Sequence, residues 1–96
     1  MIAVKIEPNG KPYLVGIEGS IAEELHLLQQ HVGGYIETVS LRDGGVMLVD
    51  EDGRMKRLSE NRGQQILGNV LIVGQKDDLL TDVPSKYYAL LAIDMV

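Results

Sequence analysis

Hydrophobic and polar positions alternate at the start of the chain, which is the pattern of a β-strand. The hydrophobic residues of segment 2–7 occupy every second position, so they would share one face of a strand. Segment 8–12 is rich in turn-forming Pro and Gly, and the hydrophobic segment 13–17 follows it. The pattern predicts a β-hairpin made of the two hydrophobic segments.

The next segment has the period of an α-helix. Ser20 and Glu23 form the pattern of a capping box, in which each side chain bonds a free backbone N–H group of the other residue. Apolar residues then recur with helical spacing and predict one apolar stripe: Ile21, Leu25, Leu28 and Val32. Gly33 suits a left-handed helix cap. We therefore expect a helix at about 21–32.

Short hydrophobic segments separated by Asp-Gly turns follow this helix. They predict an antiparallel meander of strands at 35–41, 46–49 and 54–58, with the middle strand buried. Residues 59–67 are expected to form a loop with a short helical turn. Residues 70–73 predict a further buried strand that ends at Gly74, and residues 75–78 a polar connection.

The C-terminal segment fits neither period cleanly. Pro84 is tolerated in the first turn of a helix, so we expect a helix at about 83–92, with a terminal strand as the competing interpretation. The whole pattern predicts the α+β class: a small antiparallel sheet of about five or six strands with the main helix packed on one face.

The length and composition indicate one small domain. The 96 residues contain 45% hydrophobic residues but no Phe and no Trp, so the core must consist mainly of Leu, Ile, Val and Met. Residues 1–96 are expected to be a single domain with a modest core. A small core leaves apolar surface outside, so a homo-oligomer is expected, with the C-terminal segment as the leading interface.

Charge and cysteine content narrow the classes of partner. The formal net charge of −5 argues against direct nucleic-acid binding, which needs clustered Lys and Arg. The absence of Cys excludes disulfides and thiolate sites. Segment 1–7 is too short and too charged for a signal peptide, and no apolar run approaches the ~20 residues of a membrane span. Cytoplasmic residence is the resulting expectation.

Several patterns that suggest chemistry fail on spacing. His26 and His31 are five positions apart, whereas a helical metal clamp needs four. Segment 50–53 lacks the further ligands of a calcium loop and is expected to be a solvated hairpin turn. Gly33-Gly34 follows a helix instead of opening one, which favours a cap over a phosphate loop. No metal, cofactor or catalytic set of residues is predicted, which favours a non-enzymatic function over an enzyme.

Two polar groups remain as candidate ligand contacts. Tyr35 and Glu37 are two apart on a predicted strand and so share a face. Asn61, Arg62 and Gln64 offer donors and acceptors suited to a phosphate, a carboxylate or a nucleobase edge. Structural alternatives exist for both groups: an exposed strand face with a partly buried Tyr, and an Asn cap beside an Arg that pairs with a nearby carboxylate.

The order of short motifs resembles a known family. Leu28-Gln29 and the segment Val32-Gly33-Gly34-Tyr35-Ile36-Glu37 are followed by Asp50-Glu51-Asp52-Gly53, Asn61-Arg62 and Gly68-Asn69-Val70-Leu71-Ile72-Val73. This order is similar to the family named domain of unknown function 3846, over about 20–80. Gly63 departs from the usual Ala, and the segment after Pro84 has no recognised counterpart. The resemblance implies a phage- or mobile-element-encoded accessory protein without an established activity.

Three functions are compatible with these observations. The first is a non-enzymatic counter-defence protein that binds and sequesters a small nucleotide-like signalling molecule of the host. Its contacts would be Tyr35, Glu37, Asn61, Arg62 and Gln64. The alternative is a protein-binding inhibitor of a host defence nuclease or polymerase, acting through an acidic surface. The third is a small nucleotide hydrolase.

Overall fold

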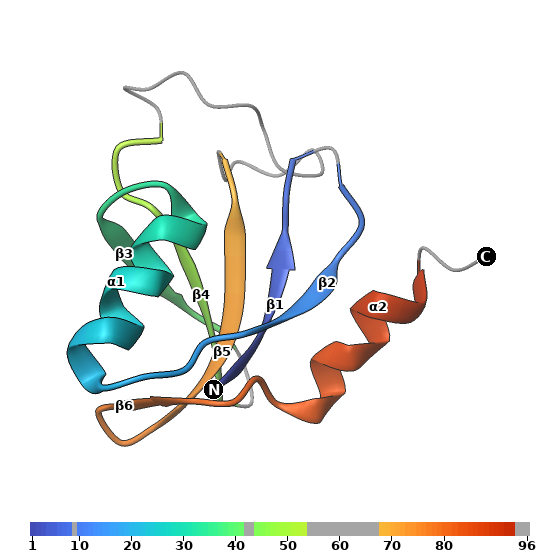
Figure 1. Cartoon of the computed structure of the whole chain (residues 1–96). Helices are drawn as coiled ribbons and strands as arrows, with labels where there is room; N and C mark the ends of the chain where they lie inside the picture. The colour runs from blue at the N-terminus through green and yellow to red at the C-terminus, as the bar shows by residue number, and fades with distance from the viewer. Residues whose placement is uncertain (9, 42–43, 54–67, 94–96) are drawn as a thin grey trace.

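An antiparallel sheet of six strands forms the centre of the protein. The computed structural model describes residues 1–8, 10–41, 44–53 and 68–93 (Figure 1). The strands are β1 (Ile2–Ile6), β2 (Tyr13–Gly16), β3 (Ile36–Ser40), β4 (Gly45–Asp50), β5 (Val70–Lys76) and β6 (Leu79–Thr81). They follow the order β2-β1-β5-β4-β3, and β6 pairs with the end of β5. The predicted α+β class is confirmed.

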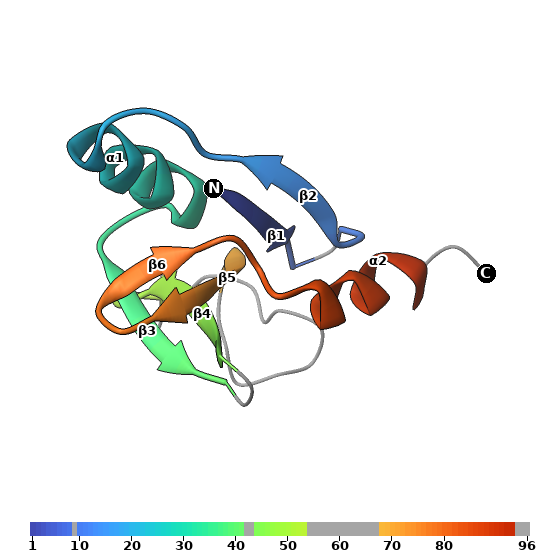
Figure 2. The same ribbon diagram turned by 90° about the horizontal axis from the view of Figure 1, so that it is seen from below.

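Helices cover both faces of this sheet. Helix α1 (Ile21–Val32) lies on one face, and the C-terminal segment lies on the other (Figure 2). That segment begins with a 3₁₀ turn, η2 (Ser85–Tyr88), and continues as α2 (Ala89–Ile93). The helix expected at about 83–92 is therefore confirmed over most of its length. A terminal strand, the competing interpretation, is wrong.

The strands carry two separate hydrophobic clusters because successive side chains point to opposite faces. The cluster under α1 contains Ala3, Ile17, Leu28, Val32, Val46, Leu48, Leu71 and Val73. The cluster on the other face contains Val4, Ile6, Val49, Val70, Ile72 and Val83, with Tyr87, Leu90 and Leu91 packed against it. The central strands β4 and β5 are hydrophobic on both faces for this reason.

Helix α1 has the predicted boundaries and the predicted caps. The Ser20 hydroxyl accepts a hydrogen bond from the Glu23 N–H (3.3 Å), and the Glu23 carboxylate accepts one from the Ser20 N–H (3.2 Å). Gly33 has φ +98°, the left-handed conformation of a C-terminal cap. The capping box and the glycine cap are both confirmed.

The predicted apolar stripe of α1 is only half buried, which corrects the sequence analysis. Leu28 and Val32 lie in the core, whereas Ile21 is 84% exposed and Leu25 52% exposed. The sheet provides packing partners for the second half of the helix only. The periodicity of the sequence specifies which side chains share a face, but the extent of the opposing surface decides which of them are buried.

The end of β5 differs from the prediction. The strand continues through Gly74 to Lys76 and turns back into β6, where a loop was expected at 75–78. Asp77 takes a positive φ of 55° in this turn, a conformation that Asp tolerates better than most residues. The polar residues of this turn favoured a loop in the sequence analysis, whereas the chain forms a β-hairpin there. The strand predicted at 54–58 and the helical turn at 59–67 lie outside the described residues.

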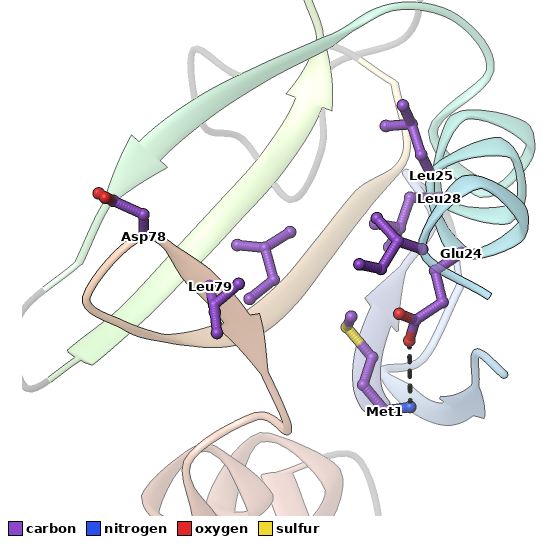
Figure 3. A pocket seen from close by; sticks show the side chains of 8 residues that line it. Met1, Glu24, Leu25, Leu28, Asp78 and Leu79 are labelled. Atoms are coloured by element: carbon purple, nitrogen blue, oxygen red, sulfur yellow. Dashed lines mark ion pairs between the residues drawn. The ribbon is translucent and has the colours of Figure 1, made fainter. Parts of the chain in front are cut away.

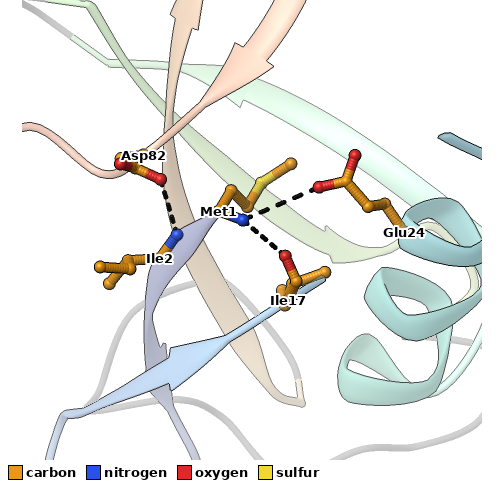
Figure 4. A network of polar contacts seen from close by, with 5 residues as sticks. All are labelled: Met1, Ile2, Ile17, Glu24 and Asp82. Atoms are coloured by element: carbon orange, nitrogen blue, oxygen red, sulfur yellow. Dashed lines mark hydrogen bonds and ion pairs between the residues drawn. The ribbon is translucent and has the colours of Figure 1, made fainter. Parts of the chain in front are cut away.

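The start of β1 is held by several neighbouring segments (Figure 4). The Met1 ammonium donates to the Ile17 carbonyl and pairs with the Glu24 carboxylate at 3.8 Å. The Ile2 N–H donates to Asp82 Oδ1 at 2.8 Å. These contacts join β1 to the end of β2, to α1 and to the exit of β6. Within the described part of the chain, no helix is long and apolar enough to cross a membrane.

Candidate functional site

The described segments that carry the family resemblance meet at one end of the sheet. This upper end contains the last turn of α1, the start of β3, the end of β4 and the start of β5 (Figure 1). The Glu51 N–H donates to the Tyr35 carbonyl at 3.0 Å, which joins the end of β4 to the start of β3. The Asn69 side-chain amide donates to the His31 carbonyl at 3.2 Å, which joins β5 to α1. Segments that are far apart in the sequence thus form one surface.

The two glycines of this end have a structural role. The N–H groups of Gly33 and Gly34 both donate to the Gln29 carbonyl, at 2.8 and 3.1 Å. Because these donors close the helix, they do not point outward as a phosphate loop requires. The cap predicted from the sequence is therefore what the glycines form.

Tyr35 and Glu37 occupy an accessible position at the start of β3. Tyr35 is 67% exposed, and Glu37 is also exposed. Ile36 packs against the cluster under α1, so strand alternation puts Glu37 on the opposite face of β3. Tyr35 directly precedes β3 and lies outside its register with β4, so the shared face with Glu37 stays a prediction.

Asn61, Arg62 and Gln64, the other predicted ligand contacts, lie outside the described residues. Gly53 and Gly68, the nearest described residues on either side, follow β4 and precede β5 at the upper end. Their proposed contribution to a site with Tyr35 stays a prediction.

A polar cluster that the sequence analysis missed lies on the α1 side of the upper end. Lys5 Nζ is 3.2 Å from His31 Nδ1. An ammonium can only donate, so Nδ1 accepts and the ring proton belongs on Nε2. Desolvation, and secondly the charge of Lys5, lowers the pKa of His31. One signal in the sequence could have indicated this cluster. Lys5 shares a face of the predicted strand with Ala3, and a charged residue beside a hydrophobic cluster usually has a polar partner.

Asp50 corrects the expectation of a fully solvated turn. It ends β4 and is a buried carboxyl group. Asp50 Oδ1 accepts a hydrogen bond from the Asp52 N–H at 2.8 Å, and its carbonyl accepts one from Gly53 at 3.2 Å. A turn is present at 51–53, and Asp50 anchors it from inside. The returning strand that would make it a hairpin lies outside the described residues. Asp50 therefore fixes the backbone beside Tyr35.

The two histidines of α1 have separate surroundings. His26 Nε2 is 3.2 Å from the side-chain nitrogen of Gln30, whereas His31 contacts Lys5. Among the residues that the structure describes, no group of three or more His, Asp or Glu could hold a metal ion.

The fold and its upper end define a small α+β protein with an antiparallel sheet between two unequal helical layers. Comparison with protein families gives the particular family. The chain belongs to the family described as "Domain of unknown function (DUF3846)", whose model matches residues 1–92. The match is wider than the 20–80 expected from the motifs, and it includes most of the C-terminal segment. Comparisons with curated proteins and with solved structures find no significant match.

Proposed function

We propose that the protein is a phage- or mobile-element-encoded accessory protein that binds and sequesters a small nucleotide-like signalling molecule, without turnover. The main support is the arrangement at the upper end: the described motifs of the family resemblance come from four elements that meet there, and Tyr35 is exposed among them. Counter-defence is the role that such a protein would have against a host that signals through nucleotides.

The chemistry of the described residues suits such a ligand. The exposed ring of Tyr35 offers a face for stacking a base. Glu37, two residues further on in β3, offers a carboxylate that accepts hydrogen bonds from a base or ribose. In this proposal Arg62 binds phosphate, and Asn61 and Gln64 complete the polar contacts.

Calorimetry with cyclic nucleotides and ADP-ribose derivatives tests the proposal. Tyr35→Ala should weaken the affinity by roughly 5- to 100-fold, because stacking on one base contributes about 1–3 kcal/mol. Thr38→Ala is the control, since Thr38 lies on β3 with its side chain on the face opposite to that of Glu37. Absence of binding across the whole panel would refute the proposal.

Recovery of the bound molecule separates sequestration from hydrolysis. A sequestering protein returns the ligand unchanged when the complex is denatured and chromatographed. Products that disappear in the Glu37→Gln variant would assign the third function, a small nucleotide hydrolase.

The alternative function, inhibition of a host nuclease or polymerase, is favoured by the acidic surface. Exposed carboxylates are spread over several elements: Glu7, Glu18, Glu23, Glu37, Glu51, Asp77, Asp78 and Asp82. A stoichiometric partner recovered from host lysate, with an affinity that falls steeply as salt is added, would support this function.

A further inference from the structure

A hollow with apolar walls lies between α1 and the β5–β6 hairpin, away from the upper end. Its volume is about 270 Å³. Figure 3 shows Leu25 and Glu24 on the helix across from Leu79 on the hairpin, with Met1 beside Glu24. The carboxylate of Asp78, at the hairpin turn, points away from the helix. The full lining is Met1, Ile21, Glu24, Leu25, Leu28, Asp78, Leu79 and Leu80.

The walls of this hollow expose large apolar side chains. Ile21, Leu25 and Leu79 are 84%, 52% and 68% exposed. They come from two elements that are far apart in the sequence, and together with the buried Leu28 they form one apolar surface. An apolar surface concentrated in a concave region is typical of a site that another molecule covers.

The charges of the lining side chains are all negative. Glu24 and Asp78 are its ionisable side chains, and Asp77 lies next to them in the hairpin turn. The Met1 ammonium is engaged by Glu24 and the Ile17 carbonyl. Gln75 lies on the side of β5 that faces α1, so its neighbour Lys76 points to the other face of the sheet, away from the hollow. Because the Met1 ammonium offsets the charge of Glu24, the negative charge of the rim comes from Asp78 and Asp77 in the hairpin turn. The hollow is therefore apolar inside and acidic at the hairpin edge of its rim.

We propose that this hollow binds an amphipathic helical segment of a partner protein, with Leu, Ile or Met on its apolar face and Lys or Arg beside that face. A helix in an apolar groove is a common mode of peptide recognition. The acidic rim complements flanking cations. It would repel an anionic lipid surface, and a second copy of this chain, with net charge −5, would bring the same carboxylates together.

A labelled peptide of about 18 residues, with Leu and Lys in a helical pattern, tests the proposal by fluorescence anisotropy with the full chain. Leu25→Gln should weaken binding by about 10-fold or more, because a buried Leu side chain contributes about 1.5–3 kcal/mol. Asp78→Asn should weaken it by roughly 2- to 5-fold at low salt and less at high salt. Leu14→Gln is the matched control: Leu14 is 46% exposed on β2, away from the hollow, and its replacement should leave the affinity within about twofold.

Three outcomes would overturn the proposal. A peptide of the same composition in scrambled order could bind equally well, which would indicate attraction by charge alone. Leu25→Gln could leave the affinity unchanged. The protein could sediment as a dimer that Leu25→Gln dissociates, which would assign the hollow to a second copy. Tyr35→Ala should not affect peptide binding, so the outcome is independent of the ligand site at the upper end.

Discussion

At the residue scale, two paired glycines allow the C-terminal segment to cross the sheet closely. Gly45 of β4 and Gly74 of β5 are opposite each other in the register. A Cβ on Gly74 would overlap the carbonyl oxygen of Asp82, and one on Gly45 would lie 2.6 Å from the Tyr87 ring. The sequence suggests turns at these glycines, but in strands they mark a close approach of other atoms.

Gly74→Ala should therefore destabilise the protein by about 1–3 kcal/mol, because the obstacle is backbone that cannot rotate away. Gly45→Ala should cost less, since the Tyr87 ring can move. Urea unfolding followed by circular dichroism measures both effects. Gly16→Ala provides the control, because a Cβ there would meet nothing within 4 Å; an equal loss in all three variants would contradict the steric explanation.

His31 should make stability depend on pH. Its pKa in the folded protein is lowered by desolvation and by Lys5, so the unfolded chain binds the proton more readily. Stability is full above the unfolded pKa of about 6.5 and decreases as the pH falls below it. His31→Gln should reduce the stability difference between about pH 5 and pH 7.5 in urea unfolding. His26→Gln, on the exposed side of α1, should retain the difference of the unmodified protein.

At the element scale, neighbouring residues in the sequence specify the ends of α1, whereas contacts with the sheet fix its position in the fold. Its capping box and glycine cap define both ends, and the acidic first turn suits the helix dipole. The sheet then buries only the second half of its apolar stripe. The first half remains available and forms one wall of the hollow, so the same helix serves both the core and a candidate interface.

Substitution of Ser20, the N-cap residue of α1, tests how much the local capping interactions stabilise the helix. Ser20→Ala should lower the free energy of unfolding by about 1 kcal/mol, because the Glu23 N–H loses its acceptor. Ser20→Asn should retain most of the stability, since Asn is an equally good cap. A loss of the same size in both variants, measured by chemical denaturation, would show that the hydroxyl acts through something other than the cap.

At the scale of the whole molecule, the described surface divides into three regions. The upper end carries the candidate ligand contacts, the hollow beside α1 carries the candidate helix site, and the C-terminal segment covers part of the other face of the sheet. Tyr88 on η2 is exposed, as is Ile2 of β1. This third region provides the apolar surface for the homo-oligomer expected from the small core.

We expect a dimer through the C-terminal segment. Tyr88→Glu should convert it to a monomer, because two such charges would be buried at an isologous interface. Native mass spectrometry reports the assembly state and any retained small molecule together. Ile21→Gln, in the hollow, should leave the assembly state unchanged; a monomeric unmodified protein would contradict the expectation.

The sequence by itself determined most of the elements, because caps, periodicity and Asp-Gly turns act over a few residues. It predicted α1 to the residue and the β1–β2 hairpin. Only the tertiary structure decided that Leu25 is exposed and that segment 75–81 forms a hairpin. It also brought Lys5, His31 and Asn69 together, since these outcomes depend on surfaces contributed by distant parts of the chain. Local interactions specify the elements, whereas burial, and with it every candidate site, is a property of the assembled fold.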